Sequence, residues 1–125
     1  MKKINTVLGE IDGASLGETL FHEHVINYNP SFYQAFGEKW FPREEVIDRA
    51  VKLFKQAKDE CNVSTIIDGT PIDLGRDIEM IKTVSEQSGV NILVSSGVYC
   101  SEEVFLRGKR RKNLQAILLT NVKRA

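Results

Sequence analysis

The sequence predicts an α/β protein in which helices cover a parallel β-sheet. Between Leu16 and Gly97, three apolar stretches alternate with two helical patterns, in the order strand–helix–strand–helix–strand. Parallel strands need a crossover connection, which is usually a helix. Polar or glycine-rich residues follow each apolar stretch, and functional groups in such folds gather at the carboxyl ends of the strands. We therefore expect a functional site where these three strands end.

The composition excludes several classes of protein. The chain has 125 residues, 42% of them hydrophobic, and its 17 Lys and Arg balance its 17 Asp and Glu. This balance gives no indication of a nucleic-acid partner. No apolar run reaches the roughly 20 residues that span a bilayer, and the N-terminus lacks a signal peptide. Cys61 and Cys100 lie far apart and are expected to stay unpaired thiols. We predict a cytoplasmic protein that binds neither nucleic acid nor membrane.

The first part of the chain predicts a hairpin, a strand and a loop. Residues 4–15 alternate in polarity and contain turn residues, which favours a small β-hairpin. The first strand of the main sheet is predicted at Leu16–His24. Asn27–Trp40 is rich in aromatic residues and is interrupted by Pro30 and Gly37. We expect it to be a long loop whose aromatic side chains pack locally rather than bind a ligand.

The rest of the sheet follows from two helical patterns and two β-branched runs. Proline and two carboxylates open a helix at Pro42, and apolar residues then recur every three or four positions up to Cys61. Val63–Asp68 reads as a strand buried on both faces. Arg76–Ser88 is predicted as a second amphipathic helix, and Val90–Ser96 as the third strand of the sheet.

The two histidines of the sequence form the most informative motif. His22 and His24 are separated by one residue at the end of the first predicted strand. Side chains alternate between the faces of a strand, so both imidazoles point to one side and Glu23 to the other. Two imidazoles on one face can hold a single divalent metal ion. An isolated His-x-His pair also occurs without a metal, so the spacing alone leaves both interpretations open.

Several separate motifs give the pair its context. They are Thr6-Val7-Leu8-Gly9, Leu16-Gly17-Glu18-Thr19-Leu20-Phe21-His22-Glu23-His24, Ile66-Ile67-Asp68-Gly69-Thr70, Asp73-Leu74-Gly75-Arg76-Asp77 and residues 89–99. In this order they resemble the N-terminal part of the phosphotriesterase family of the amidohydrolase superfamily, over residues 4–109. The resemblance implies the N-terminal part of a TIM (β/α)8 barrel, with three parallel strands and their helices after a short β-hairpin.

The resemblance also implies a function. Members of this family are zinc-dependent hydrolases that cleave phosphotriesters, lactones or related esters with a hydroxide held by two metal ions. By this resemblance, His22 and His24 are the ligands of the more buried of the two metal ions. Tyr99 matches a position that lines the substrate pocket. No catalytic side chain other than the metal ligands is implied in this stretch.

Structural roles are the competing interpretation for neighbouring residues. Asp68 and Arg76 are expected to fix loops or form a buried ion pair rather than take part in catalysis. Glu23 points away from the histidines and is expected to be structural. For Tyr99 two roles stay open, because it either contacts substrate or packs at the rim of the barrel.

The chain departs from the family in what it lacks. A whole barrel needs about 250 residues. The family's bridging lysine, its two later histidines and its aspartate have no counterpart here, and the sequence holds no third histidine. A catalytic zinc takes three protein ligands. We therefore expect this chain to be inactive alone. The alternative is a non-catalytic remnant, or a half-barrel that associates with itself through the open edge of Val90–Ser96.

The last residues suggest a reason for the departure. Residues 110–125 do not continue the family pattern, so we divide the chain into a barrel segment, 1–109, and an aberrant tail, 110–125. Codon degeneracy allows the tail to be reread one frame off as Pro-Glu-Glu-Leu-Ala-Ser-Tyr-Phe-Ile-Asn-Glu-Cys-Lys-Thr-Gly, which resembles the family's next segment. A frameshifted or truncated gene product is the resulting hypothesis, and the nucleotide sequence tests it.

Overall fold

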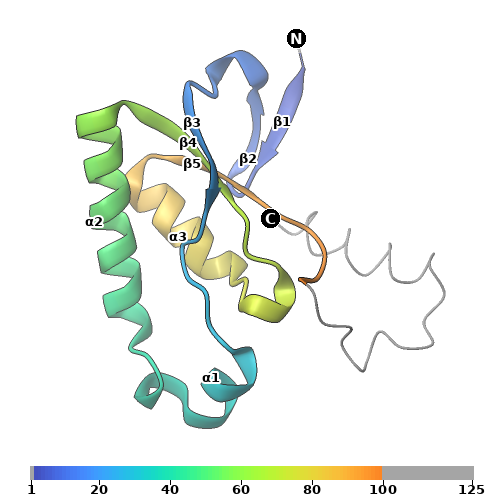
Figure 1. Ribbon diagram of the computed structural model, residues 1–125. Helices are drawn as coiled ribbons and strands as arrows, with labels where there is room; N and C mark the ends of the chain where they lie inside the picture. Colours follow the sequence, from blue (N-terminus) through green and yellow to red (C-terminus); the bar gives the residue numbers. More distant parts are fainter. Residues whose placement is uncertain (1, 100–125) are drawn as a thin grey trace, which may run out of the picture.

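The structure, a computed structural model, describes residues 2–99. The predicted tail and the boundary at residue 109 lie outside this range. A hairpin precedes a helix-covered sheet (Figure 1). The strands are β1 (Lys3–Thr6), β2 (Gly9–Asp12), β3 (Glu18–Glu23), β4 (Val63–Asp68) and β5 (Asn91–Val94). The α-helices are α1 (Pro30–Phe36), α2 (Arg43–Cys61) and α3 (Ile78–Ser88), and short 3-10 turns cover Gly13–Ser15, Gly37–Lys39 and Ile72–Leu74.

The predicted fold class is confirmed. β3, β4 and β5 form a parallel sheet in that order, with Leu20 opposite Ile66 and Ile66 opposite Ile92. The hairpin is a separate antiparallel pair in which Ile4 faces Ile11. Each parallel connection passes through a helix, as the alternation of patterns required. The carboxyl ends of the three strands therefore lie along one edge of the sheet.

The hydrophobic core lies between the sheet and its two long helices. α2 and α3 pack against each other and cover the same face of the sheet (Figure 1). Burying an aliphatic side chain of this kind contributes about 1.5–3 kcal/mol. The main cluster of buried side chains comprises Val7, Val25, Ile47, Ala50, Val51, Met80, Ile81, Val84 and Ile92. Among residues 2–99 no helix is both long and apolar enough to cross a membrane.

The two outer strands of the sheet differ in how they are protected. β4 is central and buried, as predicted. The outer edge of β5 is partly covered, because the Val7 N–H donates a 2.9 Å hydrogen bond to the Ile92 carbonyl. Val7 lies in the turn of the hairpin, and its contact with the edge that was predicted to be open at Val90–Ser96 was not expected. β3 is the second edge strand, and most of its side chains are exposed, including Phe21 at 78%.

The prediction of a long loop at Asn27–Trp40 is wrong, because this stretch contains α1. Asn29 accepts hydrogen bonds from the Ser31 and Phe32 N–H groups, at 2.9 and 3.4 Å, and caps the helix. Pro30 is the first helical residue, where its missing N–H costs nothing. An Asn-Pro pair is thus a helix start here rather than a break. The aromatic side chains of this stretch do contact one another, as expected, with ring centres of Phe32 and Trp40 4.9 Å apart.

α3 begins two residues later than predicted because Asp77 is its N-cap. One carboxylate oxygen of Asp77 accepts a 3.0 Å hydrogen bond from the Met80 N–H, which satisfies a free donor of the first turn. The same carboxylate forms an ion pair with Arg43 at the start of α2. Burial raises the pKa of Asp77, but the hydrogen bonds from Arg43 and the backbone outweigh it, so this pKa lies below its ordinary value.

Replacing Asp77 with alanine should lower the free energy of unfolding by about 1–2 kcal/mol, because the helix loses its cap. Asp77→Asn is the control that keeps a capping oxygen and loses the charge. Since the pKa of Asp77 is lowered on folding, its ionic contribution is complete above the ordinary value of 3.8 and is lost as the pH falls further. Urea unfolding followed by circular dichroism should show the Asn variant approaching the wild type as the pH is lowered below 3.8. A gap that stays constant with pH would contradict the ion pair.

Candidate metal-binding site

The two histidines lie side by side at the carboxyl end of β3. His22 belongs to the strand and His24 follows it directly. Their ring centres are 5.2 Å apart and the ring planes meet at 71°. Both side chains are exposed, so an ion from solvent can reach them. The structure therefore brings the two imidazoles together, as the alternation of side chains along a strand required.

This separation of the rings fits a shared zinc ion. A zinc ion about 2.0–2.1 Å from a coordinating nitrogen lies roughly 3.2 Å from that ring's centre, so two rings at a tetrahedral angle have centres roughly 5 Å apart. The observed 5.2 Å agrees with that distance. Neutral imidazole is also a preferred zinc ligand. The pair is thus suited to hold one metal ion, although it supplies only two ligands.

Gly69 makes room for the rings. It follows β4 directly, and its N–H donates a 2.9 Å hydrogen bond to the Glu23 carbonyl, which joins the ends of β3 and β4. A Cβ atom at Gly69 would lie 3.1 Å from Nε2 of His22 and 3.5 Å from Cε1 of His24. Any side chain there would press on the edges of both imidazole rings. The absence of a side chain keeps this space available.

The residue after Gly69 contacts the second histidine. Thr70 Oγ1 lies 2.8 Å from Nδ1 of His24 and 3.3 Å from the Ile26 carbonyl oxygen, to which it donates. Thr70 is fully buried although it is polar. A buried hydroxyl needs hydrogen-bonding partners, and both of these lie just beyond β3. The contact ties one ring of the pair to the end of β4.

Asp68 links the same two strand ends through the backbone. It is fully buried, and its two carboxylate oxygens accept hydrogen bonds from the Val25 N–H at 3.1 Å and the Thr70 N–H at 2.8 Å. Such charge-assisted bonds offset the cost of burying a carboxylate. Asp68 thus fixes the loop that carries His24, in agreement with the structural role expected from the sequence.

Arg76 is the nearby positive charge. It donates to the Ser95 carbonyl beyond the end of β5. Burial lowers the pKa of Arg76, and the charge of Asp68 acts in the opposite direction. No ion pair between Arg76 and Asp68 is seen in residues 2–99, so Arg76 fixes a loop instead. The three strand ends are held by backbone contacts from these two side chains.

The other predicted residues do not complete a metal site. Within residues 2–99, no group of three or more His, Cys, Asp and Glu side chains is placed to hold a metal ion. Glu23 is exposed and sits opposite Asp68 in the register, and its structural role stays a prediction. Tyr99 is 66% exposed, and its N–H donates to both oxygens of Asp73, at 2.9 and 3.0 Å. The role of its ring toward a substrate stays a prediction.

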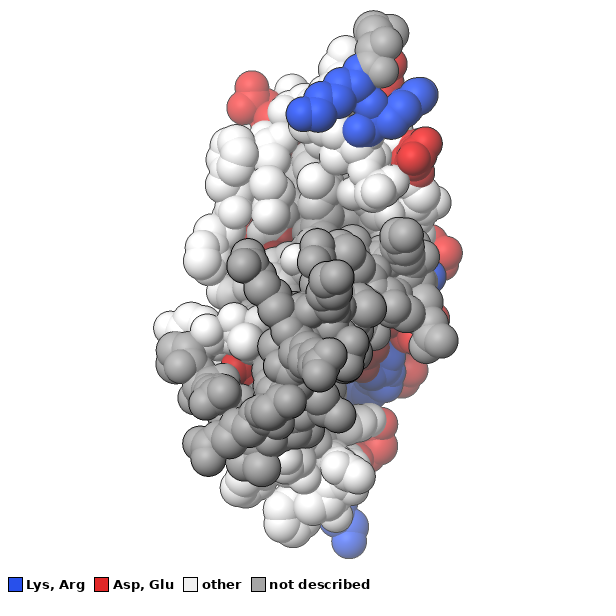
Figure 2. Space-filling view, turned by 90° about the vertical axis from the view of Figure 1, so that its right-hand side faces the viewer, with Lys and Arg blue, Asp and Glu red and all other residues white. Residues whose placement is uncertain are grey.

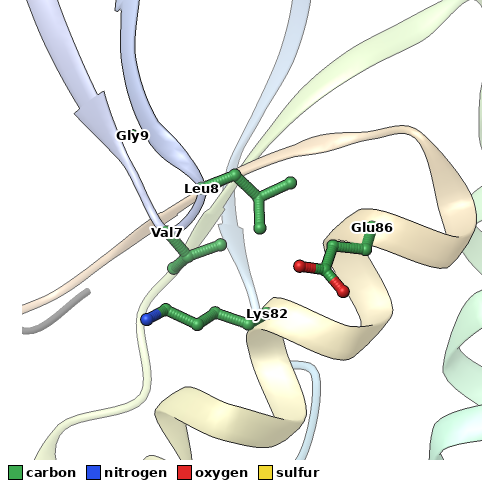
Figure 3. A pocket seen from close by; sticks show the side chains of 5 residues that line it. All are labelled: Val7, Leu8, Gly9, Lys82 and Glu86. Carbon is green, nitrogen blue, oxygen red and sulfur yellow. The ribbon is translucent and has the colours of Figure 1, made fainter.

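A separate hollow lies away from the histidines. It has a volume of about 260 Å³ and is bordered by Val7, Leu8 and Gly9 of the hairpin and by Lys82 and Glu86 of α3 (Figure 3). Figure 3 shows the two charged side chains on successive turns of α3, facing the turn of the hairpin. None of these residues comes from a carboxyl end of the parallel strands. We therefore do not assign this hollow to the candidate site.

Comparison with known proteins identifies the family. The profile of the phosphotriesterase family matches residues 2–122. The chain belongs to the phosphotriesterase family. It is 36% identical over 104 residues to a phosphotriesterase homology protein of Mycobacterium tuberculosis, a match that covers 83% of this chain and 32% of that protein. It is 33% identical over 92 residues to an aryldialkylphosphatase of Saccharolobus solfataricus, covering 71% and 28%.

A solved structure agrees with this membership of the phosphotriesterase family. The phosphotriesterase from Mycobacterium tuberculosis superposes with a TM-score of 0.76 and 34% identity, over 84% of this chain and 33% of that one. An N-acetyltaurine hydrolase of Xenopus tropicalis is a more distant relative, with 28% identity. This chain thus spans about a third of the length of the relatives it matches.

Sequence reasoning found the histidine pair and missed the residues that support it. Asp68-Gly69-Thr70 was recognised as a motif, but the contacts of Gly69 and Thr70 with the rings were not predicted. The available signal was position, because Asp68 ends β4, Gly69 and Thr70 follow it directly, and β3 and β4 are neighbours in the sheet. Functional groups at adjacent strand ends meet in such sheets.

Asp68→Asn should destabilise the protein by about 1–3 kcal/mol, because an amide NH2 cannot accept a hydrogen bond and leaves one buried backbone N–H unpaired. The Val25 or Thr70 amide should then exchange its hydrogen faster. Asp59→Asn, on the exposed side of α2, removes the same charge and is the control. Urea unfolding and hydrogen exchange measure both effects. Equal stability of the two variants would mean that Asp68 does not hold the strand ends.

Proposed function

We propose that this chain carries the first two zinc ligands of a phosphotriesterase-family hydrolase that acts on phosphotriesters, lactones or related esters. The observation that carries the proposal is the pair of imidazoles at the end of β3, with ring centres 5.2 Å apart. Membership of the family supports the hydrolase class. A cytoplasmic location is also proposed, on the basis of the two widely separated cysteines.

Each residue of the site has a part in this proposal. His22 and His24 would hold the metal, and Gly69 leaves space beside their rings. A zinc ion bound there supplies Lewis acidity and a reactive hydroxide to the full family site. Asp68 keeps the two strand ends in register through its backbone hydrogen bonds. Tyr99 would contact the substrate from the loop that follows β5.

The chain alone is proposed to be inactive. The described residues bring together two imidazoles that could act as ligands, whereas a catalytic zinc takes three ligands from the protein. The sequence contains no third histidine. The substrate-selecting residues of a barrel come from loops after all eight strands, and three such strands are described here.

A second candidate role is self-association without catalysis. It is favoured by the edge of β3, where Phe21 is 78% exposed and, among residues 2–99, the strand pairs with another strand on one side only. Edge strands with apolar side chains pair readily with other chains. Figure 2 shows the side of the molecule turned away from α2, where a group of positive side chains lies at the hairpin end and acidic side chains lie at several places on the described surface.

Zinc binding to this chain should be weak and should depend on the histidines. Equilibrium dialysis should show that His22→Ala and His24→Ala each reduce zinc binding, because each removes half of the ligand set. Cys61→Ser, which removes an exposed thiol, should leave it unchanged. Hydrolysis of paraoxon or a lactone should not exceed the background of free zinc. One tightly held zinc per chain, or lactone hydrolysis abolished by His24→Ala, would contradict the inactive two-ligand site.

The chain should also associate with itself at micromolar concentration. Sedimentation velocity should show dimers or larger species, and Phe21→Lys should shift them toward monomer, because a charge on an edge strand opposes pairing. Phe36→Lys on α1 is the control, since Phe36 is also exposed but lies away from the sheet. A wild-type monomer with a cooperative unfolding transition would rule out this role. An equal effect of both variants would place the contact elsewhere.

A further inference from the structure

The hydroxyl of Thr70 has one proton to give and two neighbours. Its oxygen lies 3.3 Å from the Ile26 carbonyl and 2.8 Å from Nδ1 of His24. A carbonyl oxygen can only accept a hydrogen bond, so the hydroxyl proton goes to Ile26. The hydroxyl oxygen is then free to accept from the ring. Both contacts are satisfied together only if Nδ1 of His24 carries a proton.

A neutral imidazole carries one proton, which decides the state of the other nitrogen. With the proton on Nδ1, the Nε2 atom of His24 has a lone pair and can bind a cation. In metal sites, a ligating histidine usually donates its second N–H to a protein oxygen, which fixes both the tautomer and the ring orientation. The hydroxyl oxygen of Thr70 lies within hydrogen-bond distance of Nδ1 of His24, where it can play the part of such a protein oxygen.

Thr70 itself is held firmly. It is fully buried, and its N–H donates a 2.8 Å hydrogen bond to Asp68, whose other oxygen accepts from Val25. The β-branched side chain restricts rotation about its first torsion angle. The hydroxyl is therefore fixed relative to the loop that carries His24. Within residues 2–99, the structure records no such hydrogen bond to either nitrogen of His22, which makes His22 an internal reference.

We propose that Thr70 is a positioning residue that holds His24 in the tautomer whose Nε2 nitrogen is available to a divalent metal ion. This inference deepens the proposed function and rests on it for the metal, but the tautomer is a property of the metal-free chain. The hydroxyl group is the element required, since it both accepts from the ring and donates to the backbone. Serine should therefore replace threonine, whereas the isosteric valine should not.

The tautomer can be read directly because the sequence has only two histidines. The chain is labelled with ¹⁵N-histidine, and the imidazole nitrogens are observed by NMR at one alkaline pH, in solution or in a spun sediment. His22→Ala assigns the signals. In the wild type and Thr70→Ser, Nδ1 of His24 should carry the proton. In Thr70→Val, protonation should move toward Nε2 while the His22 signals stay in place.

Zinc affinity is the second measurement. Loss of such a supporting contact typically lowers metal affinity by about 10–100-fold, so Thr70→Val should bind zinc at least tenfold more weakly than Thr70→Ser. A wild-type His24 protonated on Nε2, or a tautomer unchanged in a folded Thr70→Val variant, would overturn the positioning role. If Thr70→Val fails to fold, the tautomer of His24 in the wild type is the measurement that tests the positioning role. A tautomer that depends on Thr70 without zinc binding would support the positioning role and refute the zinc proposal.

Discussion

The candidate site depends on the buried carboxylate of Asp68. Past the end of β4 the Gly69 N–H still donates to the Glu23 carbonyl, but within residues 2–99 no regular backbone pairing of β3 with β4 is seen beyond that bond. Asp68 accepts one N–H from beyond each strand end, from Val25 and Thr70. An unpaired buried carboxylate is costly, so separation of the strand ends is opposed by the same charge that joins them. The histidine pair, Gly69 and Thr70 all take their positions from this link.

The fold could be predicted wherever local patterns decide the structure. The period of the apolar residues predicted α2, because burial on one face imposes that period, and continuous β-branched runs predicted β4 and β5. α1 was missed because Pro30 was read as a break, although Asn29 before it is a capping residue. The start of α3 was misplaced for a related reason, since Asp77 is set as a cap partly by Arg43, far away in the sequence.

The candidate site could be predicted only in part. Strand alternation put His22 and His24 on one face, and the ring separation agrees with it. Their supports could not be derived from spacing, because Gly69 and Thr70 reach the rings from a neighbouring strand across a change in register near Leu20. The pairing of the two histidines thus follows from local sequence, whereas the groups that contact their rings are brought there by tertiary pairing.

The hydrogen bond from Val7 to Ile92 has a consequence for how the chain folds. It joins the start of the described chain to the last strand of the sheet, so most of the intervening residues must be placed before it forms. Contacts between distant residues form late because loop closure costs entropy that only later contacts repay. During synthesis the hairpin emerges first, and it can cover the outer edge of β5 only after β5 has been made and has paired with β4. The outer edge of β5 therefore stays uncovered for a time in each newly made chain, when it is most open to pairing with a neighbour.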